Sequence, residues 1–151
     1  MSKKSLFIFL FFSFFLFGKD KKEYEYNLIY EEVKKTFSIN SEESVIGIYK
    51  IGEMRLEKAI PFLFRLLNEE RIVYLQYNGK GKWTRIDKEV EEALIKIGKN
   101  SLNYFYKLLV KNEYPYVEIN EKTKEKIVYI ISKITGEEIK EIENYIKFLK
   151  E

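Results

Sequence analysis

The chain of 151 residues contains neither cysteine nor histidine. Without cysteine it can form no disulfide and carry no lipid-modified cysteine, so its folded state must be stabilised by packing. Without histidine it lacks the commonest general base and the commonest metal ligand. A metal site would have to consist of carboxylate oxygens, which suit calcium or magnesium, and no loop has the spacing of a calcium-binding loop. The sequence therefore predicts no metal site and no cofactor.

Adjacent glutamates are the remaining candidates for acid–base chemistry. These pairs are Glu42-Glu43, Glu69-Glu70, Glu91-Glu92 and Glu137-Glu138. Hydrolysis by two carboxylates requires groups that face each other across a substrate, whereas neighbours in sequence do not face each other on a helix. We interpret the pairs as solvated faces and helix-start charges. The glycine-rich segment 78–81 lacks the spacing of a phosphate-binding loop. The sequence thus predicts no catalytic residue, and we expect the chain not to be an enzyme.

Residues 1–18 have the layout of a secretory signal peptide. Lys3 and Lys4 precede an apolar stretch, 6–17, that holds seven of the twelve phenylalanines, and Gly18 follows. As a helix this stretch would be about 18 Å long, too short for a hydrocarbon layer of about 30 Å. We therefore expect an extracytoplasmic protein, periplasmic or secreted, whose contact with the membrane is transient. Leu16 stands where a small residue is usual, so an uncleaved anchor is the alternative.

Removing Lys3 and Lys4 leaves 25 basic residues against 24 acidic ones in the remainder of the chain. A nearly neutral, exported chain is a poor candidate for binding nucleic acid. The sequence predicts no nucleic-acid partner.

One short pattern occurs three times in residues 19–151, which we expect to form one domain. It stands at 48–52, 94–98 and 131–136, and each copy ends an apolar-periodic run with a lysine, an isoleucine and a glycine. A glycine in the left-handed conformation and a lysine in the last turn are typical of a helix end. The glycines are 46 and then 38 residues apart, a period typical of paired-helix solenoids. The predicted units are a cap helix at about 22–38 and repeats at about 41–70, 84–112 and 120–151.

Local signals support these units. Asn40 and Glu43 have capping-box spacing, and Pro61 suits the first turn of a helix. Aligning the closing leucines of the units predicts which second-helix positions are equivalent. The aligned sets are Ile60, Leu102 and Ile142; Leu63, Phe105 and Tyr145; and Leu66-Leu67, Leu108-Leu109 and Phe148-Leu149. These positions are the expected core. Ser44 and Gly47 make the first unit atypical, as is expected of an end unit that packs on a cap.

Two connections are longer than a minimal solenoid needs. Segment 71–86 alternates β-forming residues around Asn78-Gly79, which predicts a β-hairpin or an extended loop. Segment 112–120 contains Pro115, which argues against a helix there.

The motif 59–63 with Leu66-Leu67, and the motif 92–99, resemble HEAT repeats of the bacterial, phycocyanobilin-lyase-like type. Ile134-Thr135-Gly136-Glu137 also resembles the closing repeat of exported proteins in that group. The resemblance covers roughly residues 41–151. HEAT repeats usually carry an Asp and an Arg that form a ladder; Asp87 and Glu118 stand near that place, without a matching Arg. The resemblance implies a right-handed stack of helix hairpins used for protein interaction, and it transfers no catalytic residue.

Two features are candidates for binding a partner. The repeat alignment places cations and aromatic or polar residues on one side of the second helices, and in stacked hairpins these helices usually line the concave face. This candidate stripe consists of Phe62, Arg65, Tyr104, Lys107, Asn144 and Lys147. It would suit an acidic or aromatic-rich segment. The alternative is ordinary helix surface, since a lysine-rich chain produces such alignments by chance.

The second candidate is the 71–86 insertion, with Tyr74, Tyr77 and the only tryptophan, Trp83. Tyrosine and tryptophan are enriched at binding hot spots, and they can also stack on sugar rings. The alternative is that Trp83 and alternate hairpin residues pack over the second unit and cover its apolar surface.

Together these patterns predict an all-α fold: a right-handed α-solenoid of HEAT-like helix hairpins with an N-terminal cap helix and a short hairpin-like insertion. We expect an exported, non-catalytic scaffold that binds another protein. The alternative function is a cell-envelope glycan-binding module that uses Trp83 and the tyrosines. A third possible function, that of a chromophore lyase-like enzyme, follows from the family resemblance alone.

Overall fold

The computed structural model describes residues 27, 29, 31–35, 37–38, 40–77, 80–114 and 117–151. The segment predicted to be a signal peptide, 1–18, lies outside these residues, as do Asn78 and Gly79 of the predicted turn. The side chain of Tyr77, one of the candidate binding residues, is also outside them.

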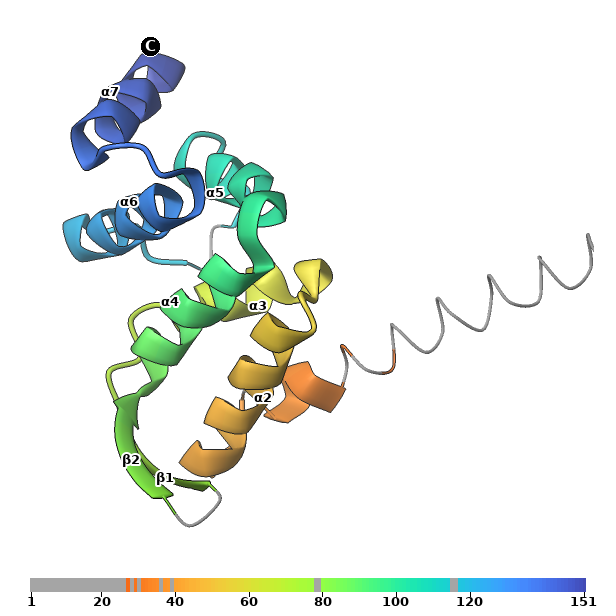
Figure 1. Cartoon of the computed structure of the whole chain (residues 1–151). Coiled ribbons are helices and arrows are strands. Elements are labelled where there is room, and N and C mark those ends of the chain that lie inside the picture. Colours follow the sequence, from red (N-terminus) through yellow and green to blue (C-terminus); the bar gives the residue numbers. More distant parts are fainter. Residues whose placement is uncertain are drawn as a thin grey trace, which may run out of the picture.

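The described chain is mostly helical and carries one antiparallel hairpin (Figure 1), so the prediction of a helical fold with a hairpin-like insertion is confirmed at this level. Residues 27, 29 and 31–35 are helical. The longer elements are α2 (Ser41–Glu53), α3 (Ile60–Phe64), β1 (Ile72–Tyr77), β2 (Lys80–Arg85), α4 (Ile86–Ile97), α5 (Leu102–Leu109), α6 (Glu121–Thr135) and α7 (Ile139–Lys150). Short 3-10 turns, Glu57–Ala59 and Gly98–Ser101, lead into α3 and α5.

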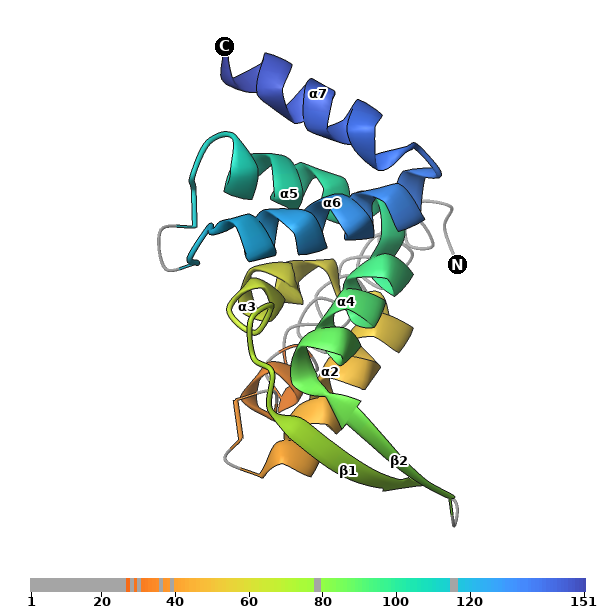
Figure 2. The ribbon, with the colours of Figure 1, turned by 90° about the vertical axis from the view of Figure 1, so that its left-hand side faces the viewer.

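In the described part of the chain, helices α2 to α7 form three successive pairs by their order in the sequence: α2 with α3, α4 with α5, and α6 with α7. Helix α2 packs along α4, α4 contacts α6, and α6 contacts both α5 and α7. Figures 1 and 2 show the hairpin at one end of the molecule and α7 at the other. A continuous apolar core runs from Ile29 through the pairs, with Ile51, Leu63 and Leu94 fully buried within it.

The helix starts agree with the capping signals. Asn40 is the N-cap of α2, and its side-chain oxygen accepts a hydrogen bond from the Glu42 backbone N–H. The predicted capping box is incomplete, because the Glu43 carboxylate accepts from the Ser38 hydroxyl instead, at 2.7 Å. Pro61 lies in the first turn of α3, where a missing N–H leaves no hydrogen bond unmade. Asn120 caps α6 by accepting from the Thr123 backbone N–H.

The three repeated glycines play two different roles. Gly98 and Gly136 have φ angles of 76° and 80° and end α4 and α6, as predicted. The same prediction for Gly52 is wrong, because α2 continues to Glu53 and Gly52 is buried inside it. A Cβ atom on Gly52 would lie 2.8 Å from the Ala93 Cα. Gly52 is therefore required for the close approach of α2 to α4.

The repeat alignment predicts nearly all core positions of the first two units, where only Leu102 is half-buried, but only part of the third, where Ile142 is buried. Leu63 and Phe105 are buried at 0% and 1% exposure, whereas the aligned Tyr145 is 62% exposed. Phe148, aligned with Leu66 and Leu108, is 71% exposed. The physical reason is position: α7 is the outermost helix of the described chain, and its contacts are made on one side only (Figure 2).

Candidate interaction surfaces

The β-hairpin presents a row of apolar side chains to solvent. In its register Ile72 pairs with Arg85, Tyr74 with Trp83 and Gln76 with Gly81, so alternate residues share a face. Ile72, Tyr74 and Trp83 are 64%, 48% and 69% exposed. The rings of Tyr74 and Trp83 lie 4.9 Å apart with an interplanar angle of 54°. We call these three residues the hairpin patch.

The opposite face of the hairpin attaches it to the helical body. Val73 is buried in the core cluster, and Leu75 packs against that cluster. On β2, the Thr84 hydroxyl donates a hydrogen bond of 2.6 Å to the buried Glu89 of α4. Val73 therefore covers apolar surface in the way the sequence suggested for Trp83, and the tryptophan ring is left in solvent.

Gly81 gives Tyr74 its position. A Cβ atom at Gly81 would lie 1.6 Å from the Tyr74 hydroxyl oxygen and 2.3 Å from the adjoining ring carbon. The phenol ring thus lies across the space above Gly81, beside Trp83. The absence of a side chain at Gly81 thus leaves room for the Tyr74 ring, and this contact was not predicted from the sequence.

The residues of the candidate stripe make separate contacts with their own neighbours. Phe62 is 39% exposed, and the guanidinium of Arg65 lies 5.2 Å from the centre of the Phe37 ring. On α5 the Lys107 ammonium lies 5.9 Å from the centre of the Tyr104 ring. The same ammonium is 3.9 Å from a carboxylate oxygen of Glu113. Burial, with the nearby charge of Glu57, raises the pKa of the half-buried Tyr104.

The last two stripe residues, Asn144 and Lys147, are exposed on α7. Lys147 lines a groove of about 320 Å³ between α6 and α7, together with Lys124, Lys150 and three glutamates. The structure therefore pairs Lys107 with Tyr104 and places Lys147 in a separate groove of mixed charge. The stripe remains a hypothesis.

A buried ionic cluster connects the three helix pairs. Asp87, in the first turn of α4, is fully buried. Its carboxylate accepts hydrogen bonds from Arg85 Nε at 3.0 Å, Arg85 Nη2 at 2.7 Å and Lys126 Nζ at 2.5 Å. Lys126 also donates to the Leu67 carbonyl oxygen at 2.6 Å. Glu70 extends the cluster to the surface, where it pairs with Arg85 and Lys122.

The hydrogen bonds of the cluster favour the ionised forms of its carboxyl groups. Burial opposes ionisation of the Asp87 carboxyl, but the hydrogen bonds from Arg85 and Lys126 outweigh it and lower its pKa. The Lys122 ammonium lowers the pKa of Glu70 as well. Both groups are held as paired anions, so neither is suited to exchange protons near neutral pH.

The pair Glu91-Glu92 is only partly on a solvated face, contrary to the interpretation of its sequence. Glu91 was expected on a solvated face, yet its side chain is buried, and both carboxylate oxygens accept hydrogen bonds from Lys88 at 3.0 and 2.9 Å. Its neighbour Glu92 is exposed. The two carboxylates thus point into different surroundings, in agreement with the view that adjacent glutamates do not act together.

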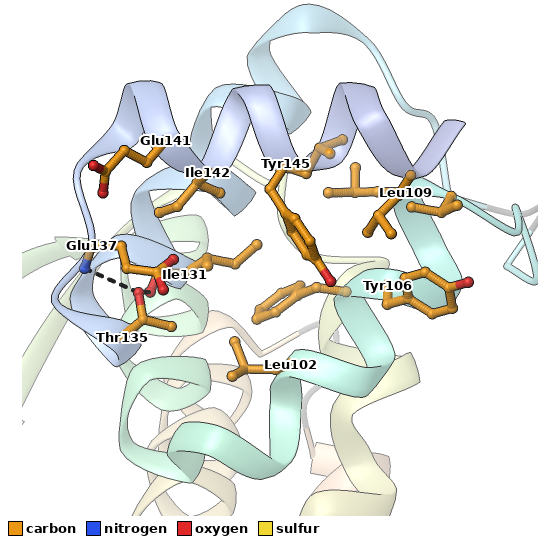
Figure 3. A pocket seen from close by; sticks show the side chains of 13 residues that line it. Leu102, Tyr106, Leu109, Ile131, Thr135, Glu137, Glu141, Ile142 and Tyr145 are labelled. Carbon is orange, nitrogen blue, oxygen red and sulfur yellow. Dashed lines mark hydrogen bonds between the residues drawn. The ribbon is translucent and has the colours of Figure 1, made fainter. Parts of the chain in front are cut away.

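An open groove lies between α5 and α7 (Figure 3). It has a volume of about 520 Å³ and a mainly apolar lining, including Leu102, Phe105, Ile131 and Tyr145. Figure 3 shows Glu137 and Glu141 together at one end of the groove. Sequence reasoning missed this site. The available signal was the assignment of two large aromatic side chains, Tyr145 and Phe148, to core positions of the third unit.

In comparisons with known proteins, no family model, no curated protein and no solved structure matches the chain. Within the described ranges, no helix is long and apolar enough to cross a membrane. The same residues contain no group of three or more acidic side chains placed to hold a metal ion.

Proposed function

We propose that this chain is an exported, right-handed α-solenoid of HEAT-like helix hairpins that acts as a non-catalytic scaffold for another protein. The observation that carries the proposal is the hairpin patch: the rings of Tyr74 and Trp83 are in tilted contact, and both side chains are exposed on a hairpin that is anchored through Val73. Exposed tryptophan and tyrosine are the residues most enriched at binding hot spots.

Three successive helix pairs support the solenoid part of the proposal. Contacts run in order from α2 to α4 and from α4 to α6, as in a stack of repeats. Lys126 bridges the Leu67 carbonyl of the first pair and the Asp87 carboxylate of the second. Asp87 stands near the ladder position noted in the sequence, and a lysine from the next unit occupies the role that an arginine usually has in HEAT repeats.

The hairpin favours a protein partner through its rigidity. Two aromatic side chains with few rotatable bonds, already held against one another, lose little conformational entropy on binding. Ile72 continues the same face, so the patch offers aliphatic as well as aromatic contact area. Such a mixed apolar row fits a complementary protein surface.

Site-specific crosslinking tests the proposal. A photo-crosslinking residue replaces Ile72 in the full chain, and crosslinked products are compared with and without Trp83→Ala in the native envelope. We expect one discrete partner band that Trp83→Ala weakens about tenfold, as for a hot-spot residue. Lys99→Ala, an exposed change far from the hairpin, serves as the control. A band that is unaffected by Trp83→Ala would contradict the proposal.

A glycan is the second candidate ligand, because the exposed face of Trp83 could also stack on a sugar ring. Trp83 is the only tryptophan of the chain, so intrinsic fluorescence reports on this site alone. Saturable quenching by a soluble envelope glycan would favour the glycan. Unchanged emission across a broad glycan panel would eliminate it.

A further inference from the structure

We propose that the groove between α5 and α7 binds an apolar helical segment of a partner protein that carries a lysine or arginine at one end. This inference rests on the proposed scaffold function and adds a second docking site to it, at the opposite end of the molecule from the hairpin patch (Figure 1).

The shape of the groove is suited to inserted side chains. Its volume of about 520 Å³ lies within the range of sites that bury small ligands. Leu102, Phe105 and Leu109 line it from α5, and Ile142, Ile146 and Leu149 line it from α7. Ile131 of α6 lies between them. A partner segment can therefore contact apolar side chains on three sides.

The polar groups of the groove specify the charge of the occupant. Glu137 and Glu141 line one end, and no lysine or arginine lines the groove (Figure 3). Within the described residues neither carboxylate takes part in a hydrogen bond or ion pair. A cation at the end of the occupant would complement them, whereas a fatty acid or an acidic peptide would add like charge. The smaller groove of α7 is lined by three lysines and three glutamates and shows no such preference.

The rim of the groove extends the contact surface. Tyr145, 62% exposed, reaches from α7 toward α5 in Figure 3, and Phe148, 71% exposed, lies one helical turn further along α7. Residues three apart lie on the same side of a helix, so Tyr145, which lines the groove, and Phe148, which does not, share one exposed apolar margin of α7. An amphipathic helix with apolar residues at intervals of three and four can use both the groove and this margin.

Two short synthetic peptides test the charge and the shape together. Both have the same amphipathic leucine pattern, one with lysines on its polar positions and one with glutamates, and each carries a fluorophore for anisotropy titration of the full chain. We expect the leucine–lysine peptide to bind at least about tenfold more tightly. Glu137→Gln with Glu141→Gln should reduce this ratio to near one. Glu143→Gln, on the other side of α7, is the matched control and should leave the ratio unchanged.

A third variant reverses the charge without touching the core. Thr135 is exposed and lines the groove, so Thr135→Lys introduces a cation there while circular dichroism verifies the fold. It should weaken the leucine–lysine peptide and strengthen the leucine–glutamate peptide. Equal binding of the two peptides by the unchanged chain overturns the proposal. A dimer in sedimentation velocity that Thr135→Lys dissociates would assign the groove to a second copy and also overturns it.

The outcome is separable from that of the hairpin crosslink. Trp83→Ala should leave the peptide titration unaltered, because Trp83 lies outside the groove. Loss of the leucine–lysine preference with an intact hairpin crosslink refutes the groove and leaves the scaffold function in place. Absence of the crosslink with the preference intact refutes the hairpin as the partner site.

Discussion

The two seams between successive second helices differ in how well they are closed. Between α3 and α5, Phe64 contacts Phe105 at a ring distance of 5.5 Å, and Tyr114 meets Phe64 edge-on at 5.5 Å. Between α5 and α7 a groove of about 520 Å³ remains. The aligned residues Phe105 and Tyr145 therefore lie in different environments, one buried and the other exposed. Repeat alignment predicts which residues face a seam, but large side chains do not by themselves close it, because Phe105, Tyr106 and Tyr145 line the open groove.

The closed seam is filled from outside the repeat pattern as well. Tyr114 belongs to the connection between α5 and α6 and packs against the core cluster from there. At the open seam, Tyr145 and Phe148 are instead left exposed on α7. The packed contact between α3 and α5 therefore stabilises the fold, whereas the groove between α5 and α7 is accessible to solvent.

The largest expected difference between the seams is in the stability lost on truncation. Phe105→Ala removes a side chain that is 1% exposed and should lower the free energy of unfolding by about 4 kcal/mol. Tyr145→Ala removes the aligned side chain, which is 62% exposed, and should cost less than about 1 kcal/mol. Urea denaturation of both variants measures the difference. Equal losses would mean that α7 is closed over α5 in solution and that the open groove is wrong.

The ionic cluster that joins α4 and α6 to Leu67, just after α3, should show the next largest effect. Lys126→Met keeps the aliphatic stem but removes the ammonium that joins Asp87 to the Leu67 carbonyl. Leaving Asp87 with Arg85 alone should cost about 3 kcal/mol. Lys133→Met is the control, because Lys133 is an exposed lysine of the same helix. If both methionine variants unfold at the same urea concentration, the cluster does not stabilise the seam.

The same cluster predicts a dependence of stability on pH. The Asp87 pKa is lowered in the folded chain, so the stabilisation it provides is present above the ordinary aspartate value of about 3.9. This stabilisation is lost as the pH falls through the lowered folded value. Asp87→Asn should be less stable near neutral pH, and its stability should fall less steeply between about pH 5 and pH 2. Parallel curves for the two proteins would show that Asp87 is not paired as described.

The contact between α2 and α4 tests whether two helices pack closely because one of them has a glycine, Gly52, at the point of contact. Gly52→Ala brings a Cβ atom within 2.8 Å of the Ala93 Cα, so the helices must move apart, at a cost of about 2 kcal/mol. Gly98→Ala meets no neighbour but forces alanine to a φ of 76° with a ψ of −143°, a combination that favours glycine, and it should cost about 1 to 3 kcal/mol. Thermal denaturation of the two variants compares their losses of stability. A milder effect at Gly52 would show that the α2–α4 contact yields easily.

Much of this architecture is predictable from local sequence because its causes are local. Asn40 and Pro61 start helices, and Gly98 and Gly136 end them, through backbone chemistry within a few residues. Periodicity likewise predicts the buried faces of α4 and α6. Gly52 was misassigned because a repeated motif suggests equal roles, whereas the contact with Ala93 depends on the distance between two helices.

The remaining features depend on groups that are distant in sequence. The partners of Asp87 include Lys126, 39 residues away, and no spacing rule connects them. The open groove depends on the direction in which α7 leaves Gly136, because Phe105, Tyr106 and Tyr145 all line the groove without closing it. The hairpin patch was predicted as a binding candidate because Trp83 and Tyr74 are recognisable as residue types, but their exposure depends on which hairpin face Val73 anchors.

The smallest effect on stability is expected at the hairpin patch, where the surface is open and the side chains can move. Gly81→Ala places a Cβ atom where the Tyr74 hydroxyl lies, so the phenol ring must rotate away from Trp83. Because the displaced atoms are the end of a half-exposed side chain, the free energy of unfolding should change by less than about 0.5 kcal/mol. The emission of Trp83 should nevertheless shift as its ring loses the contact with Tyr74. Gln76→Ala, which alters the residue paired with Gly81, should leave the emission as it is. A Gly81→Ala protein with unchanged emission would show that Tyr74 does not hold the Trp83 ring in place. The hairpin patch would then no longer illustrate how an exposed surface adjusts to a change that the packed contact between α3 and α5 could not accommodate.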